Sequence, residues 1–141
     1  MTYRGGCHCG RNRFEIEGDL QQVMECNCSI CTMRGYLHWS VPREKLRLLT
    51  PESNLAAYTF KTGTVKHHFC PNCGSSVFWE GDRGPDYYGI AVGCFADPDF
   101  PAPIYSAYED AKHRWFDTTS AKEHFPGPRP AGLPVSQNSP Q

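Results

Sequence analysis

The stretch Cys26-Asn27-Cys28-Ser29-Ile30-Cys31 places three cysteines within six residues, and it is the feature around which the rest of the chain must fold. One residue separates the first two cysteines and two residues separate the next pair, so a local turn can bring all three sulfur atoms to one point. A tetrahedral zinc ion with Zn–S distances of about 2.3 Å needs sulfur atoms about 3.8 Å apart, which such a turn can supply. The stretch is therefore typical of a metal site, but it offers only three ligands.

The fourth ligand separates two kinds of metal site. A structural zinc ion has four protein ligands, whereas a catalytic zinc ion keeps one position for water or substrate. In the structural alternative, the site is completed by one of four side chains, which are His38, His67, His68 and Cys94. In the catalytic alternative, water or a substrate thiol takes that position, and zinc lowers the pKa of the thiol and presents it as a nucleophile. Free cysteines are usually buried and inert, so for Cys94 we favour a packing role over a thiol facing this site.

Two further cysteine pairs lie far apart in the sequence and together offer four ligands. Cys7 and Cys9 lie in a CxC turn, and Cys70 and Cys73 lie in a CxxC turn. Glycines beside each pair supply the backbone freedom that a metal-binding turn needs. Two such turns sharing one zinc ion form the usual closed structural site. Disulfides or free thiols are the alternative, but these short spacings favour metal, and a redox CxxC would need a βαβ context that the sequence lacks.

Composition and charge indicate a small globular protein. The chain has 141 residues and a formal net charge of -1, which argues against a nucleic-acid binder because such proteins carry a basic excess. The first residues contain no apolar signal region and no later stretch is apolar enough to span a membrane, so we expect no membrane partner and a reducing, cytoplasmic location. We expect one domain over residues 1–125 and a flexible tail rich in proline, glycine and serine over residues 126–141.

The polar and apolar pattern predicts a mainly β protein with little helix. Arg13–Glu17 alternates as a half-buried strand does, and no long window keeps an apolar pattern of helical period. One helical turn is expected at Pro42–Lys45, where proline stands at the first position. Further strands are expected at residues 3–9, 36–41, 46–48, 56–60, 65–69, 76–80 and 87–92, with 56–60 and 65–69 forming a hairpin.

Several single side chains carry weaker predictions. His67 and His68 are neighbours on an expected strand, so one of them should face outward. Arg34, Lys66 and Arg114 are candidates for binding a carboxylate, although ordinary solvated charge is the simpler role for each. The three tryptophans are predicted to pack in the core, and they are Trp39, Trp79 and Trp115. Trp115 and Phe116 are expected to be the last anchored residues.

Three motifs in a fixed order also resemble a known family: Gly6-Cys7-His8-Cys9-Gly10, the three-cysteine stretch at residues 26–31, and Phe69-Cys70-Pro71-Asn72-Cys73-Gly74. This arrangement resembles the family of the glutathione-dependent formaldehyde-activating enzyme and centromere protein V, over about Tyr3 to Trp115. The resemblance implies a β-tent fold of small antiparallel sheets and two zinc ions per chain. It implies a structural zinc ion at Cys7, Cys9, Cys70 and Cys73, and a catalytic zinc ion at Cys26, Cys28 and Cys31.

The function that the resemblance implies is S-hydroxymethylglutathione synthesis, in which a carbon–sulfur bond is made or broken between glutathione and formaldehyde. We therefore predict a zinc-dependent carbon–sulfur lyase that acts on an adduct of glutathione, or a similar small thiol, with a small aldehyde. The alternative is a noncatalytic, zinc-stabilised β module that binds a protein partner, with both metals structural. The number of protein ligands at the second metal separates these two predictions.

Overall fold

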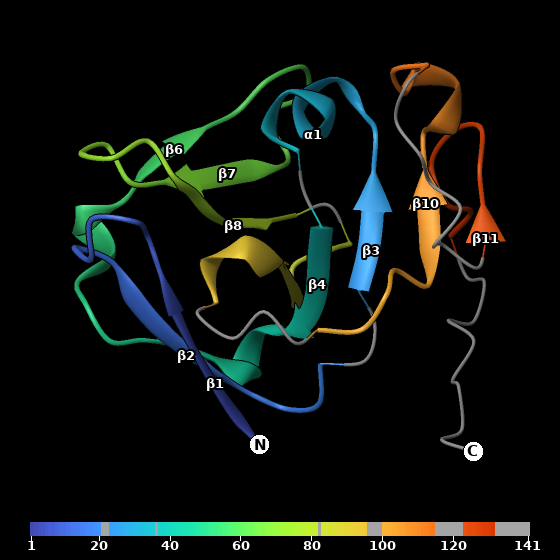
Figure 1. The fold of residues 1–141 in the computed structure, drawn as a ribbon. Helices are drawn as coiled ribbons and strands as arrows, with labels where there is room; N and C mark the ends of the chain where they lie inside the picture. Colours follow the sequence, from blue (N-terminus) through green and yellow to red (C-terminus); the bar gives the residue numbers. More distant parts are fainter. Residues whose placement is uncertain (21–22, 36, 82, 96–99, 115–122, 132–141) are drawn as a thin grey trace.

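The computed structural model describes residues 1–20, 23–35, 37–81, 83–95, 100–114 and 123–131. Within these residues the fold is mainly β, with two sheets and one short α-helix (Figure 1). This confirms the predicted fold class. The two sheets differ in size, because one has three strands and the other has eight.

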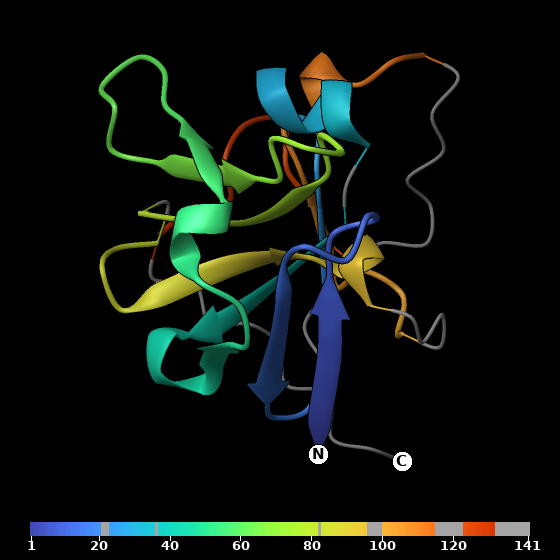
Figure 2. The same cartoon turned by 90° about the vertical axis from the view of Figure 1, so that its left-hand side faces the viewer.

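The smaller sheet has the strand order β1-β2-β5 and is antiparallel throughout. Its strands are β1 (Thr2–Gly6), β2 (Arg13–Glu17) and β5 (Leu46–Leu48). Phe14 and Ile16 of β2 are buried while Arg13 and Glu17 are exposed, so the predicted alternation is confirmed. In Figure 2 the blue hairpin of β1 and β2 runs across the direction of the green and yellow strands of the larger sheet.

The larger sheet has the strand order β11-β10-β3-β4-β9-β8-β7-β6. Neighbouring strands from β3 to β6 pair antiparallel, whereas β10 pairs parallel with both β3 and β11. The expected hairpin of 56–60 and 65–69 is present as β6 and β7. The strands are β3 (Val23–Cys26), β4 (Leu37–Pro42), β6 (Ala56–Tyr58), β7 (Lys66–Phe69), β8 (Ser76–Glu80), β9 (Tyr87–Ala91), β10 (Tyr105–Ala107) and β11 (Glu123–His124).

Helical structure is limited to short segments among the described residues. The α-helix is α1 (Ser29–Arg34), and Gly35 ends it in the left-handed conformation with φ of 66°. The predicted turn after Pro42 is the 3-10 helix η1 (Arg43–Lys45). The other 3-10 turns are η2 (Glu52–Asn54), η3 (Val92–Cys94) and η4 (Glu109–Ala111). The sequence did not predict α1, because six residues are too few to show helical periodicity.

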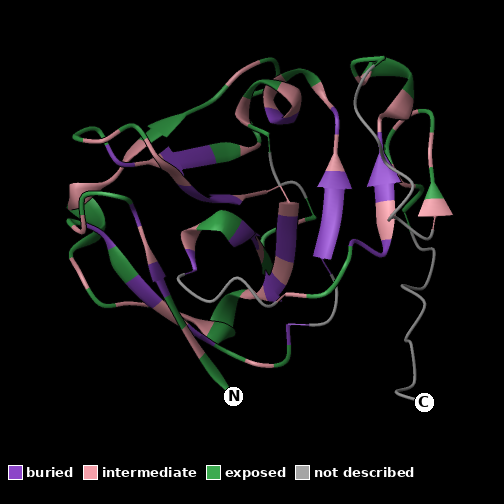
Figure 3. Cartoon of the chain, viewed as in Figure 1, coloured by how far each residue is buried: buried purple, intermediate pink, exposed green. Residues whose placement is uncertain are grey.

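The core joins side chains from both sheets. Phe14 of the smaller sheet and Val41, Phe78 and Ile90 of the larger one are each no more than 2% exposed and belong to one apolar cluster. Figure 3 shows buried residues along β3, β4 and β10. Two of the three tryptophans are buried as predicted, Trp39 at 4% and Trp79 at 3% exposure, and Trp115 and Phe116 lie outside the described residues.

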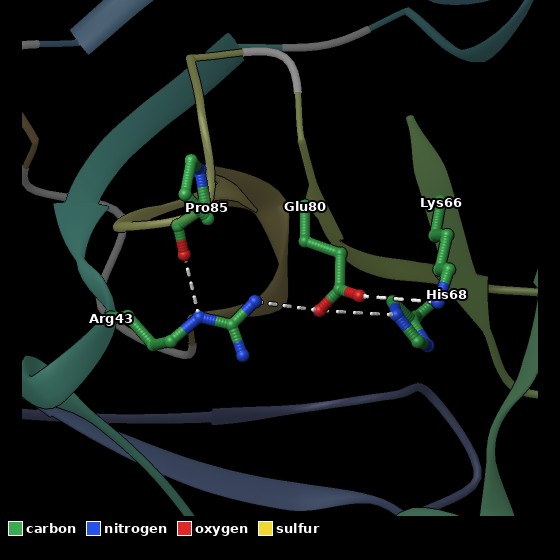
Figure 4. A network of polar contacts seen from close by, with 5 residues as sticks. All are labelled: Arg43, Lys66, His68, Glu80 and Pro85. Atoms are coloured by element: carbon green, nitrogen blue, oxygen red, sulfur yellow. Dashed lines mark hydrogen bonds and ion pairs between the residues drawn. The ribbon is translucent and has the colours of Figure 1, made fainter. Parts of the chain in front are cut away.

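The prediction that His67 or His68 faces outward is wrong, because both side chains are buried. They lie on opposite faces of β7, and each face is covered. The ring of His67 packs near Phe60, with centroids 5.7 Å apart, while the ring of His68 stacks on Phe78 at 4.5 Å. Beside His68, the carboxylate of Glu80 also pairs with two cationic side chains, Arg43 and Lys66 (Figure 4).

The C-terminal part of the described chain returns to the larger sheet. The amide of Phe125 donates to the carbonyl of Ser106 in β10, and the carbonyls of Pro126 and Gly127 accept hydrogen bonds from Asp110 and Tyr108. The start of the expected tail at residue 126 therefore pairs with the segment after β10, and residues 132–141 lie outside the described part. Among the described residues, none of the helices has the length and apolar character needed to cross a membrane.

Candidate metal centres

The first centre is formed by four cysteines that the fold collects from two distant turns. Cys7 and Cys9 follow β1, and Cys70 and Cys73 follow β7. All four sulfur atoms lie within 4.8 Å of one another. The Cys9 sulfur lies 3.6 Å from that of Cys7 and 3.6 Å from that of Cys70. These distances are close to the spacing of about 3.8 Å that a tetrahedral zinc ion requires, so the donor set fits zinc.

Both turns depend on a glycine at a left-handed position. In the first turn the amide of Gly10 donates to the carbonyl of Cys7 at 3.1 Å, and in the second the amide of Gly74 donates to the carbonyl of Cys70 at 2.7 Å. The φ angles of these glycines are 83° and 78°. Side chains with a Cβ rarely adopt such angles, so glycine lets each turn close around a metal.

Hydrogen bonds at this centre favour the thiolate form of two cysteines. Burial alone would raise the pKa of Cys7, but the backbone and side-chain amides of Asn12 donate to its sulfur, and the net shift of the pKa is downward. The pKa of Cys73 is lowered to about 5, first by the hydroxyl of Ser75, whose oxygen lies 3.4 Å from the sulfur. Because a metal ion binds deprotonated cysteines, these hydrogen bonds favour metal binding at this centre.

The second centre is formed by Cys26, Cys28 and Cys31, whose sulfur atoms also lie within 4.8 Å of one another. Cys26 ends β3, Cys28 is the N-cap of α1, and Cys31 is the one buried residue of that helix. Hydrogen bonds from the thiols of Cys26 and Cys31 lower the pKa of Cys28 to about 2, and the same contact with Cys28 raises the pKa of Cys26 to about 12. The pKa of Cys31 is also raised, first by its contact with Cys26. The three thiols are therefore close enough to shift one another's pKa values.

The structure distinguishes the four side chains considered as a fourth ligand. The Nε2 atom of His38 lies 3.3 Å from the sulfur of Cys31. His67 is close enough to Cys28 for the thiolate to act on its pKa, which burial and the charge of Arg34 lower overall. His68 lies on the opposite face of β7 beside Glu80. The buried His38 has its pKa lowered to about 4, chiefly by desolvation, so its imidazole is neutral at neutral pH.

Cys94 does not face the second centre, which corrects that alternative. Its thiol donates to the carbonyl of Ser76 at 3.2 Å, and its side chain packs against the core. Burial raises the pKa of Cys94 to about 12, and the nearby charges of Cys7 and Cys73 add to this effect. Cys94 is therefore a neighbour of the first centre.

The second centre is held by residues that sequence reasoning missed. The amide of Asn27 donates to the carbonyl of Ala107 at 3.0 Å, and its side chain donates to the same carbonyl and to Ser106. These contacts tie the centre to β10, where Ala107 pairs in register with Cys26. Because β3 and β10 are parallel, the residue after β10, Tyr108, also comes to this edge. The local sequence feature that could have indicated this contact is an asparagine between two cysteines.

Tyr108 lies near the three thiols. Burial raises the pKa of its hydroxyl, and the charges of Cys26, Cys28 and Cys31 raise it further. The residue has a φ angle of 55°, which is uncommon for a side chain with a Cβ. Its hydroxyl remains protonated at neutral pH and is a hydrogen-bond donor beside the second centre.

The three candidate carboxylate anchors have different surroundings. Arg34 ends α1, three residues after Cys31, and its Nη1 atom is buried without a hydrogen-bond partner among the described residues. Lys66 lies 3.8 Å from the carboxylate of Glu80 on the far side of β7 from His67. Arg114 is exposed. Of the three, Arg34 lies on the helix of the second centre.

The fold and the two centres define a small β protein that can hold two metal ions, one between four cysteines and one between three. Residues 2–111 match the family described as glutathione-dependent formaldehyde-activating enzyme, and the chain belongs to this family. The match includes all seven clustered cysteines and confirms the resemblance seen in the sequence. The chain is also similar to the crystal structure of a Rhodobacter sphaeroides protein determined as a structural genomics target, with 32% identity and a TM-score of 0.62. That match covers 70% of this chain and 92% of the other.

Proposed function

We propose that the protein is a zinc-dependent carbon–sulfur lyase that acts on an adduct of glutathione, or a similar small thiol, with a small aldehyde such as formaldehyde. Cys26, Cys28 and Cys31 hold the catalytic zinc ion on this proposal, and the four-cysteine centre holds a structural one. The difference between the two clusters carries the proposal, because four thiols complete a tetrahedral site whereas three leave a position for substrate. The family supports it, since its description names glutathione and formaldehyde.

The chemistry needs an activated thiol and a place for the aldehyde oxygen. A zinc ion bound by three cysteines would bind the substrate thiol as a thiolate at neutral pH. In the forward direction the substrate sulfur would form a bond to the aldehyde carbon while the π electron pair of the carbonyl moves to its oxygen. The thiol would release its proton to water, and the oxygen would take one proton from water, so the protons balance. The protonated hydroxyl of Tyr108 is suited to donate a hydrogen bond to this oxygen. The reverse sequence breaks the carbon–sulfur bond.

The second candidate function is a noncatalytic module in which both metals are structural. The contact between His38 and Cys31 favours it, because an imidazole nitrogen 3.3 Å from one ligand sulfur is near enough to serve as a fourth ligand. A Cys₃His site of this kind would be closed to a substrate thiol. The two functions thus differ in what occupies one coordination position.

Zinc content and zinc-edge X-ray absorption, each measured with and without glutathione, test the proposal. The lyase requires two zinc ions per chain and a mean sulfur count that rises when glutathione is added. A saturated count that glutathione does not change supports the closed module. Exchange NMR measures how fast formaldehyde and glutathione form and release their adduct. The wild-type protein should raise this rate above the spontaneous rate.

Cys28→Ser provides the matched variant for both measurements. If Cys28 is a ligand of a catalytic zinc ion, this variant stays folded, loses the glutathione-dependent rise in sulfur count, and exchanges the adduct at the spontaneous rate. Global unfolding of Cys28→Ser supports a structural role for the second centre instead. Ser29→Ala is the control, because it changes an exposed side chain of the same helix that belongs to neither centre.

A further inference from the structure

A groove of about 750 Å³ extends from the first centre to the end of the helix that carries the second. Its lining includes Cys7 of the first centre and Arg34 and Gly35 at the end of α1. Cys94 also lines it, but its raised pKa makes its thiol a poor nucleophile. None of Cys26, Cys28 and Cys31 lines the groove, so a ligand with one end at the three-cysteine centre would enter the groove past the end of α1.

Two arginines line the groove although the protein as a whole is not basic. Its lining includes Arg13, Arg34 and His8, and no aspartate or glutamate is among the described residues that line it. The chain has a formal net charge of -1, so the two arginines are a local feature and not a property of the whole surface. Positive charge lining a concave surface concentrates anions there.

Arg34 lines this groove, and one donor of its guanidinium is unused. Its Nη1 atom is buried and has no hydrogen-bond partner among the described residues. A buried donor without a partner costs free energy, and the cost is greater for a charged group. Arg34 and Cys31 are three residues apart on α1, which places their side chains on neighbouring positions of one helix face. An acceptor bound by Arg34 would therefore lie next to the three-cysteine centre.

Arg13 supplies a second guanidinium to the lining of the groove. A Cβ atom on Gly10 would lie 2.8 Å from Nη2 of Arg13, and a Cβ atom on Gly6 would lie 3.1 Å from its Nη1. The guanidinium thus lies against two glycines of the first metal-binding turn. Outside the sheet ladder, Arg13 makes hydrogen bonds to described residues only through its backbone. No group among the described residues therefore accepts a hydrogen bond from its guanidinium.

We propose that this groove binds a carboxylate of the thiol substrate, and that Arg34 and Arg13 hold it. Arginine binds a carboxylate through two parallel hydrogen bonds, so it selects this group over a neutral amide. The consequence is specificity for a thiol that carries a carboxylate over a neutral thiol. The inference rests on the proposed function for the position of the sulfur, but carboxylate binding in the groove does not require catalysis.

A thiol-free tripeptide tests the groove separately from the metal chemistry. The probe is γ-glutamyl-2-aminobutyryl-glycine, which has the carboxylates of glutathione but no sulfur, and calorimetry measures its binding to the zinc-loaded protein. We expect Arg34→Gln and Arg13→Gln each to weaken binding by about 10- to 100-fold, because each loses charged hydrogen bonds. Arg34→Lys should keep part of the affinity. Arg83→Gln is the control, since Arg83 is not in the groove and donates to Ser40.

Two further results decide the proposal. Equal binding of the tripeptide and its diamide, or unchanged affinity in both arginine variants, would overturn it. Zinc content and circular dichroism identify a variant that has lost its fold. If Arg34→Gln is unfolded, the tripeptide affinities of Arg34→Lys and Arg13→Gln decide whether the arginines bind the carboxylate. Arginine-dependent binding of the tripeptide, together with a sulfur count that glutathione leaves unchanged, supports the groove and rejects the lyase.

Discussion

The Nε2 atom of His38 lies 3.3 Å from the Sγ atom of Cys31, and this contact joins β4 to the helix that holds the second metal centre. His38 is buried, and its ring packs edge-on against Trp79 with centroids 4.4 Å apart. At neutral pH the imidazole is uncharged, so a proton on Nε2 could be donated to the sulfur of Cys31 when a metal holds that cysteine as a thiolate. A donor to a ligand sulfur orients that ligand and affects how strongly it binds a metal.

Replacing His38 should weaken the second metal centre. We expect His38→Leu to lower its zinc affinity by about 10- to 100-fold, the usual effect of losing a group that supports a ligand. His38→Gln, which keeps an N–H donor, should restore part of the affinity. Competition with a chromophoric chelator measures both. If both variants bind only one zinc ion per chain, His38 is itself a ligand and the centre is closed.

Removing a cysteine of the first centre should unfold the protein. Cys70 is 0% exposed and joins the end of β7 to the turn after β1. Binding of a structural zinc ion contributes ~10–16 kcal/mol in small domains, more than the net stability of many proteins. We expect Cys70→Ser to lose zinc and the far-ultraviolet circular dichroism of the native fold. A folded Cys70→Ser that retains both zinc ions would contradict the structural role.

Adding a methyl group at Gly89 should destabilise the larger sheet. A Cβ atom there would lie 2.2 Å from the indole of Trp79, which is itself buried against His38. Because the indole has no free space to move into, we expect Gly89→Ala to lower the free energy of unfolding by about 1–3 kcal/mol. Urea unfolding of the zinc-loaded protein measures this. Gly127→Ala is the control, since its Cβ would meet no atom within 4 Å, and an equal loss in both would disprove the steric explanation.

The burial of His68 should make stability depend on pH. Burial lowers its pKa, and the charge of Glu80 offsets this only in part. The unfolded chain, with an ordinary histidine pKa of about 6.5, therefore binds the proton more readily than the folded one. This histidine thus contributes a loss of stability as the pH falls through about 6.5 toward the lower pKa of the folded state. Above a pH of about 6.5 the histidine is neutral in both the folded and the unfolded chain, so its burial does not make stability depend on pH there.

We expect His68→Gln to reduce the dependence of the unfolding free energy on pH between about 7 and 5, measured at saturating zinc. Lys66→Gln is the matched comparison in the same network (Figure 4), because it changes the pairing of Glu80 but keeps the histidine. An unchanged slope in His68→Gln, or an equal change in both variants, would show that protonation of His68 is not the cause.

Much of the fold follows from local patterns. The alternation in Arg13–Glu17 places Phe14 and Ile16 inside, and Pro42 begins the one predicted helical turn. Helix α1 was missed because its six residues are too few to show an apolar period. The orientation of His67 and His68 was only half predictable. The period of a strand puts them on opposite faces, but those faces are covered by Phe60, which follows β6, and by Phe78 of β8.

The sequence alone was sufficient to identify the cysteines of both clusters and the family, because these depend on residue type and on short spacings along the chain. The surroundings of the second cluster depend on the folded sheet. Asn27 meets Ser106 across 79 residues, and Tyr108 reaches the thiols because β10 pairs parallel with β3. Such partners are brought together by strand order and register, which arise from the packing of the whole core and leave no mark in the local spacing of residues.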